Sequence, residues 1–479
     1  MFIGLDLGTS GLKGIVLDDD QNLVASASAS LTVSRPHPGW SEQDPAHWIS
    51  ACKQVLAELA SKIDMARVAG IGLSGQMHGA TALDAADQVL WPCILWNDTR
   101  SADEAAAMDA DPDFRKLSGN IVFPGFTAPK IEWLRVHHPD VFDTIAKVLL
   151  PKDYLRLWFT GEHVAEMSDA TGTSWLDTGA RDWSDALLTT CHLTRDHMPR
   201  LVEGSEVSGG VRNEVATQFG LKPGTPVAGG GGDNASSAIG VGVVKAGQAF
   251  VSLGTSGVLF AANDSYRPDA QTAVHTFCHA VPNTWHQMGV ILAATDALAW
   301  YANLVGDDPA TLTNGLGDLR APSDTVFLPY LGGERTPLND AAIRGAFIGL
   351  DHTTDSKAAT RAVLEGVTFA LKDCQMALAA TGTTLESVTA VGGGSASLYW
   401  LEAIATALNV QIDVPEDGEL GGAFGAARLG MMAATGAGAE LATSPKMERH
   451  IVPNATLTHA FEDGYARYTR TRDAIRGLS

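Results

Sequence analysis

Apolar residues recur along the chain in two patterns that predict two kinds of element. Short apolar runs at 2–7 (FIGLDL) and 14–17 (GIVL) predict two strands joined by a glycine-rich turn. Longer segments at 47–63, 362–378 and 398–410 repeat their apolar residues at helical spacing. Strands and helices alternate in this way throughout the 479 residues, which is typical of an α/β protein.

The five-residue stretch LGTSG occurs twice, and each copy joins two apolar, strand-like runs. It lies at 7–11 and again at 253–257, about half the chain apart. A chain of 479 residues is too long for one ordinary core, so two similar domains facing one another across a cleft are expected. The Gly- and Pro-rich stretch 221–247 lies near the midpoint, and we expect the domains to be residues 1–244 and 245–479.

The LGTSG turns are candidates for phosphate binding. A tight glycine turn directs backbone N–H groups outward, and Thr and Ser hydroxyls add donors, so two such turns could hold a polyphosphate from both sides. Asp6 precedes the first copy and Lys13 follows it, whereas Ser252 and Leu259 occupy the matching places in the second. A carboxylate and an ammonium group beside a phosphate are typical of a magnesium–nucleotide site. The alternatives are two unrelated hairpin turns, a capping Asp6 and a solvated Lys13.

Further candidate residues follow other predicted strands. The stretch GGGGDN at 229–234 exposes Asp233, which can accept a proton from a hydroxyl nucleophile; a local turn is the alternative. Met77 and His78 follow a glycine-rich strand, and Trp96 ends another, where its ring can pack on a sugar. A structural histidine and a core tryptophan are the ordinary interpretations of the last two.

Two further glycine-rich motifs resemble nucleotide-binding sequences, and only one of them stays a candidate. The run 389–405 has the order strand, glycine turn, helix, and a helix N-terminus after Gly392, Gly393 and Gly394 favours a phosphate or ribose neighbour. A helix entry that needs a tight turn explains this run equally well. By contrast, the GxGxxG at 70–75 is not followed by a helical pattern, so we interpret its match to the dinucleotide fingerprint as accidental.

Composition and charge exclude several classes of function. The net charge is −22 and the pI is about 4.9, and a surface of this sign repels nucleic acid and anionic lipid. The five cysteines are widely separated, which predicts free thiols in a reducing compartment. The chain has no run of about 18 apolar residues and no basic, apolar leader, so we expect a cytoplasmic protein that binds neither nucleic acid nor membrane.

Several stretches occur together in an order that resembles one family. They are DLGTSGLK, SRPHPGWSEQDPAHW, GQMHG, ILWNDTR, FPGFTAPKIEWL, LLPKDYLRLWFTGE, GGGGDN, LGTSG, FLPYLGGERTP and VGGGSAS. Together they are similar to the FGGY carbohydrate kinases over nearly the whole chain, more weakly after about residue 430. The resemblance implies the duplicated ribonuclease-H-like fold of actin and hexokinase, with a cleft between a sugar-binding first domain and a nucleotide-binding second domain.

The resemblance also implies roles for individual residues. Asp233 matches the catalytic base, and Asp6 matches the carboxylate linked to the metal. The expected sugar contacts are Met77, His78, Trp96, Asp233 and Asn234. The expected ATP contacts are Thr9, Ser10 and Lys13 in the first turn, Gly254 and Thr255 in the second, and Gly393 and Gly394 in the glycine turn. Related glycerol kinases have an amide side chain after those glycines, but Ala396, Ser397 and Leu398 stand there, so the adenine contacts stay open.

The implied reaction is transfer of the ATP γ-phosphate, with Mg²⁺, to O5 of D-xylulose, which yields D-xylulose 5-phosphate. A small ketose and ATP are the expected partners, and a homodimer is an open alternative to a monomer. Ribulose, glycerol or another polyol are alternative substrates. An actin-like chaperone or filament ATPase and a sugar sensor without catalysis are alternative classes; the presence of both Asp6 and Asp233 argues against a sensor.

Overall fold

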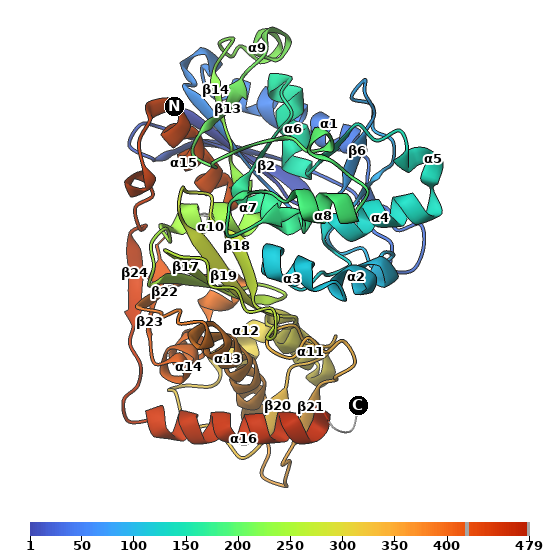
Figure 1. Cartoon of the computed structure of the whole chain (residues 1–479). Helices are drawn as coiled ribbons and strands as arrows, with labels where there is room; N and C mark the ends of the chain where they lie inside the picture. Colours follow the sequence, from blue (N-terminus) through green and yellow to red (C-terminus); the bar gives the residue numbers. More distant parts are fainter. Residues whose placement is uncertain (417–420, 477–479) are drawn as a thin grey trace.

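The structure is a computed structural model that describes residues 1–416 and 421–476. Two lobes lie one above the other, and each is built around a seven-stranded sheet (Figure 1). The first sheet comprises β1 (Phe2–Leu7), β2 (Gly11–Leu17), β3 (Leu23–Ser30), β5 (Gly70–Gly75), β13 (Val207–Gly210), β14 (Pro226–Ala228) and β15 (Gly231–Gly232). The second comprises β16 (Gln248–Leu253), β17 (Gly257–Asn263), β18 (His275–Cys278), β19 (Trp285–Ile291), β22 (Ser387–Val391), β23 (Gln411–Pro415) and β24 (Met447–Ile451).

The two sheets repeat one strand order. In the first, β1 pairs with β2 antiparallel and with β5 parallel, and β3 continues beyond β2. In the second, β16 pairs with β17 antiparallel and with β22 parallel, and β19 continues beyond β17. Each LGTSG copy joins the two hairpin strands at the centre of its sheet. The expected duplicated α/β fold is therefore confirmed.

Helices cover both sheets. The helix α1 (Pro45–Ala60) packs on β2 and β3 of the first sheet, as the pattern at 47–63 predicted. On the second sheet lie α11 (Thr295–Val305), α13 (Ser356–Ala380) and α14 (Leu398–Leu408), and α16 (Thr458–Arg476) crosses the outer end of that lobe (Figure 1). Between β5 and β14 the chain forms the side of the first lobe, which includes β6 (Thr81–Leu83), β7 (Cys93–Ile94), α2 (Ala102–Asp109), α3 (Pro112–Ser118), α4 (Thr127–His137), β8 (Lys147–Leu149), α6 (Pro151–Thr160), β9 (Val164–Glu166), α7 (Met167–Ala170), α8 (Asp185–Thr190) and α9 (Asn213–Phe219).

One helix from late in the chain packs on the first sheet. The helix α15 (Gly422–Thr435) lies against β1, β5 and β14, in the upper lobe of Figure 1. Its backbone approaches so closely that a Cβ at Gly72 would lie 1.7 Å from the carbonyl oxygen of Ala426. The glycines of the GxGxxG motif therefore form a strand, β5, and admit a helix against its face, as expected for a motif that is no dinucleotide fingerprint.

Conversely, a helix from the first half of the chain packs on the second sheet. The helix α10 (Asp233–Val241) packs through Ala238 against Phe250 and Phe260 of the second sheet. It also crosses α15 closely, since a Cβ at Gly425 would lie 1.7 Å from the carbonyl oxygen of Ser236. The division into contiguous domains 1–244 and 245–479 stays a prediction, but the two lobes share these crossed helices.

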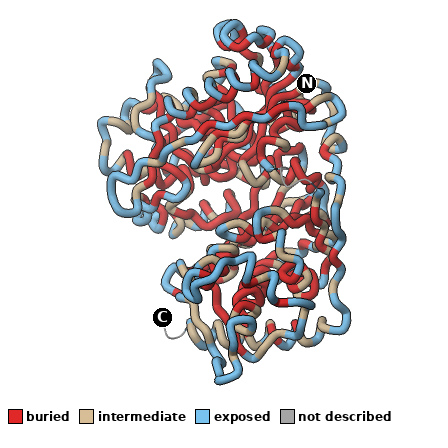
Figure 2. The backbone as a smooth tube through the Cα atoms, turned by 180° about the vertical axis from the view of Figure 1, so that it is seen from behind, coloured by how far each residue is buried: buried red, intermediate tan, exposed pale blue. Residues whose placement is uncertain are grey.

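Buried segments fill the centres of both lobes, and exposed loops surround them (Figure 2). The five cysteines are all buried, and none forms a disulfide. Within the described ranges, no helix has the length and apolar character needed to cross a membrane.

Candidate active site

Two carboxylates meet at the ends of neighbouring parallel strands. Asp6 lies near the end of β1, level with Ser74 of β5, and the Ser74 hydroxyl donates a hydrogen bond of 2.8 Å to Asp6 Oδ1. On the other side of β5, Gly232 of β15 pairs with Gly75, and the next residue, Asp233, begins α10. Because the carboxyl ends of these parallel strands share one edge of the sheet, Asp6 and Asp233 lie in a common site.

The environment tunes both acids. Burial and, next, the negative charge of Asp6 raise the pKa of Asp233 to about 6, although hydrogen bonds from the Asn234 backbone N–H (2.7 Å) and side-chain amide (3.0 Å) oppose the rise. Burial also raises the pKa of Asp6, against the opposing effects of Ser74 and Lys13. A carboxyl group with a pKa near 6 is ionised at neutral pH and basic enough to accept a proton from a hydroxyl group.

A buried ionic cluster holds the glycine run that precedes Asp233. The Arg156 guanidinium donates to the carbonyl oxygen of Gly229, and the Gly232 N–H donates to Ser168 Oγ at 3.1 Å. Ser168 in turn donates to Glu166 at 2.8 Å. The cluster consists of Lys152, Asp153, Arg156, Glu166 and Asp169, all fully buried.

The sequence analysis did not single out this cluster. The one available signal was the presence of three charged residues, Lys152, Asp153 and Arg156, in the otherwise apolar helix α6. Their contacts with the strand and turn at 164–170 depend on tertiary packing, which spacing along the chain does not reveal.

Met77 and His78 lie close to the glycine run that ends at Asp233. A Cβ at Gly232 would lie 2.7 Å from Met77 Sδ, so the thioether packs directly on the glycine run. His78 Nδ1 lies 2.8 Å from the carbonyl oxygen of Gly172 and must donate to it, which leaves Nε2 as a hydrogen-bond acceptor. Burial lowers the pKa of His78 to about 3, so the ring is neutral. A neutral imidazole acceptor and a soft apolar neighbour suit the O–H and C–H groups of a polyol.

Residues of the second lobe contact the aromatic side chains beside His78. The His78 ring stacks on Phe126 with 4.5 Å between ring centroids, and Phe126 lies 5.6 Å from Phe123. The Arg335 guanidinium, from the second lobe, lies over the Phe123 ring at 3.9 Å, and His275 of β18 lies 5.4 Å from the same ring. Sequence reasoning did not assign Arg335, although it lies inside the stretch FLPYLGGERTP.

Trp96 lies at the surface of this region and contacts the first LGTSG turn. Its side chain is 49% exposed, so the interpretation as a core tryptophan is wrong. Its indole N–H donates to Thr9 Oγ1 at 3.0 Å, and the Thr9 hydroxyl donates to Gln76 at 2.9 Å. The expected outward hydroxyl donor at Thr9 is thus already engaged, while Ser10 is exposed and Lys13 lies opposite Asp6 in the hairpin.

The second LGTSG turn is braced by α11. The carbonyl oxygen of Gly254 accepts hydrogen bonds from Thr295 N–H (2.9 Å) and Thr295 Oγ1 (2.7 Å), and Thr255 is exposed. The glycine turn after β22 packs beside it, where a Cβ at Gly394 would lie 2.7 Å from the Leu253 side chain. A Cβ at Gly393 would meet open space.

A cavity of about 480 Å³ lies beside the glycine turn and the helix α10 that begins at Asp233. Gly392 and Gly393 line it, as do Ser237, one helical turn after Asp233 on α10, and Gly421. The residue after Gly421 is Gly422, at which a Cβ would lie 2.9 Å from Asp6 Oδ1. The volume lies in the usual range for a small-molecule site. Of the expected nucleotide-side residues, Gly393 lines this cavity, and each of the two acids lies near another residue of its lining, Asp233 one helical turn before Ser237 and Asp6 beside the residue after Gly421.

Comparison with known proteins identifies the family. The model for the FGGY family of carbohydrate kinases, N-terminal domain, matches residues 1–240, and that for the C-terminal domain matches residues 249–434. The chain belongs to the FGGY family of carbohydrate kinases. Xylulose kinase of Escherichia coli K12 is 46% identical over all of this chain and 98% of its own, and that of Klebsiella pneumoniae is 48% identical over 90% of each.

Solved FGGY structures agree with this assignment. A structure titled as a xyloylose kinase from Brucella ovis is 59% identical, with a TM-score of 0.98 and full coverage of both chains. Xylulose kinase from Rhodospirillum rubrum is 28% identical, with a TM-score of 0.94 over 100% of this chain and 99% of its own. Plasmodium falciparum glycerol kinase with ADP is 19% identical, with a TM-score of 0.91 over 99% of this chain and 97% of its own, and it supports the fold alone.

Mg²⁺ fits at Asp6 of this FGGY kinase. Among the described residues, no group of three or more His, Cys, Asp or Glu side chains has a metal-binding arrangement. Asp6 is a single, partly buried carboxylate, and the neighbouring Gly422 has no side chain to cover it. One carboxylate suits Mg²⁺, which takes most of its ligands from water and substrate phosphates in kinase sites.

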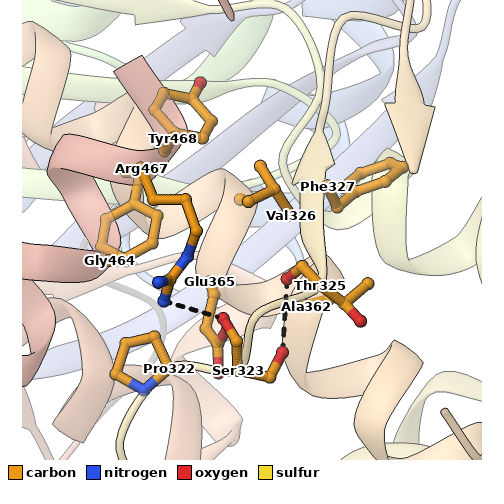
Figure 3. A pocket seen from close by; sticks show the side chains of 12 residues that line it. Pro322, Ser323, Thr325, Val326, Phe327, Ala362, Glu365, Gly464, Arg467 and Tyr468 are labelled. Carbon is orange, nitrogen blue, oxygen red and sulfur yellow. Dashed lines mark hydrogen bonds between the residues drawn. The ribbon is translucent and has the colours of Figure 1, made fainter. Parts of the chain in front are cut away.

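A small void in the second lobe is separate from this site. It lies between β20 (Val326–Leu328), α13 and α16, and its volume of about 10 Å³ is near the limit for one water molecule (Figure 3). Glu365 reaches it with Oε1 unpaired, and burial raises the pKa of Glu365 to about 8. None of the residues that line this void belongs to the two LGTSG turns or to the region around Met77 and His78.

Proposed function

We propose that the chain transfers the γ-phosphoryl group of ATP to O5 of D-xylulose, with Asp233 as the general base. The observation that supports this most directly is the place of Asp233. It directly follows Gly232, which packs on Met77, and it lies one helical turn before Ser237, which lines the cavity beside the glycine turn. Relatives 46–48% identical over most of the chain are xylulose kinases, which favours this ketose among the possible sugars.

The proposed mechanism assigns the sugar to the first lobe. His78 Nε2 accepts a hydrogen bond from a hydroxyl group, and the exposed Trp96 ring packs on the C–H face. Asn234 fixes the Asp233 carboxylate through two hydrogen bonds to the same oxygen. Asp233 takes the O5 proton as that oxygen attacks the γ-phosphorus, and the bond between this phosphorus and the bridging oxygen of ADP breaks.

The phosphate groups are assigned to the two turns. Lys13 and the backbone N–H groups of both LGTSG turns stabilise the charge on the transferred phosphoryl group. Asp6 would hold Mg²⁺, which when bound neutralises phosphate charge. Approach of the two lobes excludes water, which would otherwise compete with the sugar hydroxyl.

The Asp233→Asn variant tests the role of the base. The amide keeps the shape of the carboxylate but accepts no proton, so kcat should fall by about 10²–10⁴. Nucleotide affinity should change little, and Asp20→Asn, at an exposed turn, serves as the control. Near-normal turnover in Asp233→Asn would show that the proton leaves by another route.

The position of phosphorylation and the choice of sugar need a separate test. Carbon–phosphorus coupling in the NMR spectrum of the product should identify carbon 5 as the esterified position. A site that pairs particular hydroxyl groups rejects polyols that lack them, so kcat/KM for glycerol should lie far below that for D-xylulose. A product esterified at carbon 1, or a preference for glycerol, would contradict the proposal.

A further inference from the structure

A closed set of hydrogen bonds joins the Trp96 ring to the first LGTSG turn. The Trp96 indole N–H donates to Thr9 Oγ1 (3.0 Å), and the Thr9 hydroxyl donates to Gln76 Oε1 (2.9 Å). Gln76 Nε2 donates to Gln43 Oε1 (3.0 Å), and Gln43 Nε2 donates to the carbonyl oxygen of Thr9 (2.7 Å). The set therefore begins and ends at Thr9, and it includes both the side chain and the backbone of the turn.

The direction of every hydrogen bond in this set is fixed by two tryptophans that donate into it, Trp96 and Trp48. An indole N–H can only donate, so Thr9 Oγ1 accepts from Trp96 and its single hydrogen is left for Gln76. At the other end, the N–H of the fully buried Trp48 donates to Gln43 Oε1 at 2.9 Å. That contact turns the Gln43 amide nitrogen toward the Thr9 carbonyl. Neither glutamine amide can be reversed without placing two acceptors or two donors together.

The orientation of the Trp96 ring depends on Thr9. The backbone near Trp96 is anchored, because Arg100 pairs with Asp98 and Glu42 at 2.7 Å each. The ring itself is half exposed, and its one polar atom bonds to Thr9. Gln76, which accepts the hydrogen bond from Thr9, directly precedes Met77 in the chain. The first LGTSG turn, the Trp96 ring and the Gln76 side chain are thus one hydrogen-bonded unit.

We propose that Thr9 is a positioning residue that couples ketose binding to the geometry of the first phosphate turn. The proposal rests on the proposed function, in which Trp96 contacts the ketose and the turn contacts phosphate. The Thr9 hydrogen is used within the protein, so the side chain acts by fixing the turn and not by donating to phosphate. Coupling of this kind is reciprocal: a ketose that orders Trp96 strengthens nucleotide binding, and a nucleotide that orders the turn strengthens ketose binding.

Calorimetric titration of ADP with Mg²⁺ measures the coupling. The titration is made with and without 5-deoxy-D-xylulose, a ketose that lacks the reacting hydroxyl group. In the unaltered protein and in Thr9→Ser, which keeps the hydroxyl, the ketose should tighten ADP binding at least about fivefold. In Thr9→Val, of similar volume, and in Trp96→Phe, which keeps a ring, this factor should fall to about one. The double variant should lose nothing more, because both changes break the same link.

A second measurement needs neither turnover nor a ketose. In ¹⁵N-labelled protein the Trp96 indole resonance is the one lost in Trp96→Phe. We expect Mg²⁺–ADP to shift it in the unaltered protein and in Thr9→Ser, but not in Thr9→Val. The indole of Trp183, at the side of the first lobe, donates to the carbonyl oxygen of Pro199 at 2.9 Å; its resonance should not respond and controls for general effects.

The outcomes separate the two proposals. An indole resonance that responds equally to ADP in Thr9→Val, or a ketose effect on ADP affinity that survives this change, would overturn the role of Thr9. A protein that leaves xylulose unphosphorylated while its Trp96 resonance still responds to ADP through Thr9 would overturn the proposed substrate and keep the link between the ring and the turn.

Discussion

The two LGTSG turns have the same sequence but are held in place by different means. Side chains from the sugar side brace the first turn, through Gln43, Gln76 and Trp96. The first turn of a helix braces the second, where Thr295 donates twice to Gly254. Turns of identical sequence are therefore held differently: side chains from three separate segments of the first lobe hold the first turn, whereas the start of α11 holds the second.

The hairpins also differ in register by one residue. Leu7 pairs with Leu12 in the first hairpin, whereas Leu253 pairs with Gly257 in the second, so four residues connect the first pair and three connect the second. Asp6 consequently faces Lys13, while the matching Ser252 faces Val258 and not Leu259, the residue that alignment of the two stretches suggests. Only the first hairpin places opposite charges across its strands.

The strands beside the hairpins continue this difference. After β5 come Gln76, Met77 and His78, whose side chains contact Thr9, the glycine run at Gly232 and the Phe126 ring. After β22, at the equivalent place, come Gly392 and Gly393, which border an open cavity. The two halves of one duplicated fold thus place polar and aromatic side chains after one strand and glycines beside a cavity after the other.

The largest expected difference between the two turns comes from replacing the residue at the matching place before each, Asp6 or Ser252. Asp6→Asn removes the carboxylate that faces Lys13, and we expect kcat to fall by about 10²–10³, a loss typical for one electrostatic contact in a transition state. The defect should shrink as Mg²⁺ concentration rises. Ser252→Asn, the matched change beside the second turn, should alter kcat less than threefold, roughly the size of an ordinary surface change. Equal losses in the two variants would show that the turns are interchangeable.

The next largest expected effect is on the pH dependence of kcat/KM, which should respond to a change beside the first turn and not to one beside the second. Asp233, with its pKa of about 6, must be ionised to accept a proton, so kcat/KM should fall about tenfold for each pH unit below 6. The charge of Asp6 raises this pKa, so Asp6→Asn should lower it and move the acid limb of the residual activity to lower pH. Ser252→Asn should leave the limb in place. A limb unchanged in Asp6→Asn would mean that the two acids do not interact.

The smallest expected effect concerns the brace of the second turn. Thr295→Val removes one of two hydrogen bonds to Gly254, a loss of about 1 kcal/mol, so KM for ATP should rise about fivefold while KM for the ketose stays constant. Thr471→Val, which removes a similar hydroxyl–carbonyl bond on the distant α16, is the control. An equal rise in both KM values would indicate that the second turn, like the first, is linked to the sugar pocket.

Local patterns account for what could be predicted from the sequence. Both hairpins, the strand that leads to Asp233 and the helix at 47–63 follow from period and glycine placement over fewer than about 20 residues. The one-residue difference in register does not, because both hairpins have the same turn sequence, LGTSG, and this sequence forms a four-residue connection in one hairpin and a three-residue connection in the other. Arg335 and the buried cluster around Lys152 reach the site through packing between segments far apart in the chain, and no local spacing records such contacts.

The crossed helices set the order in which the molecule can be completed during synthesis. The face of β1 and β5 is covered by α15, whose last residue is Thr435, so the first half leaves the ribosome with this apolar surface open. At about 5–20 residues per second, the wait for α15 is on the order of tens of seconds. The nascent first half must therefore remain incompletely folded for that time, shielded by chaperones or by its own transient contacts. Any nonsense codon before residue 422 would leave it without its covering helix.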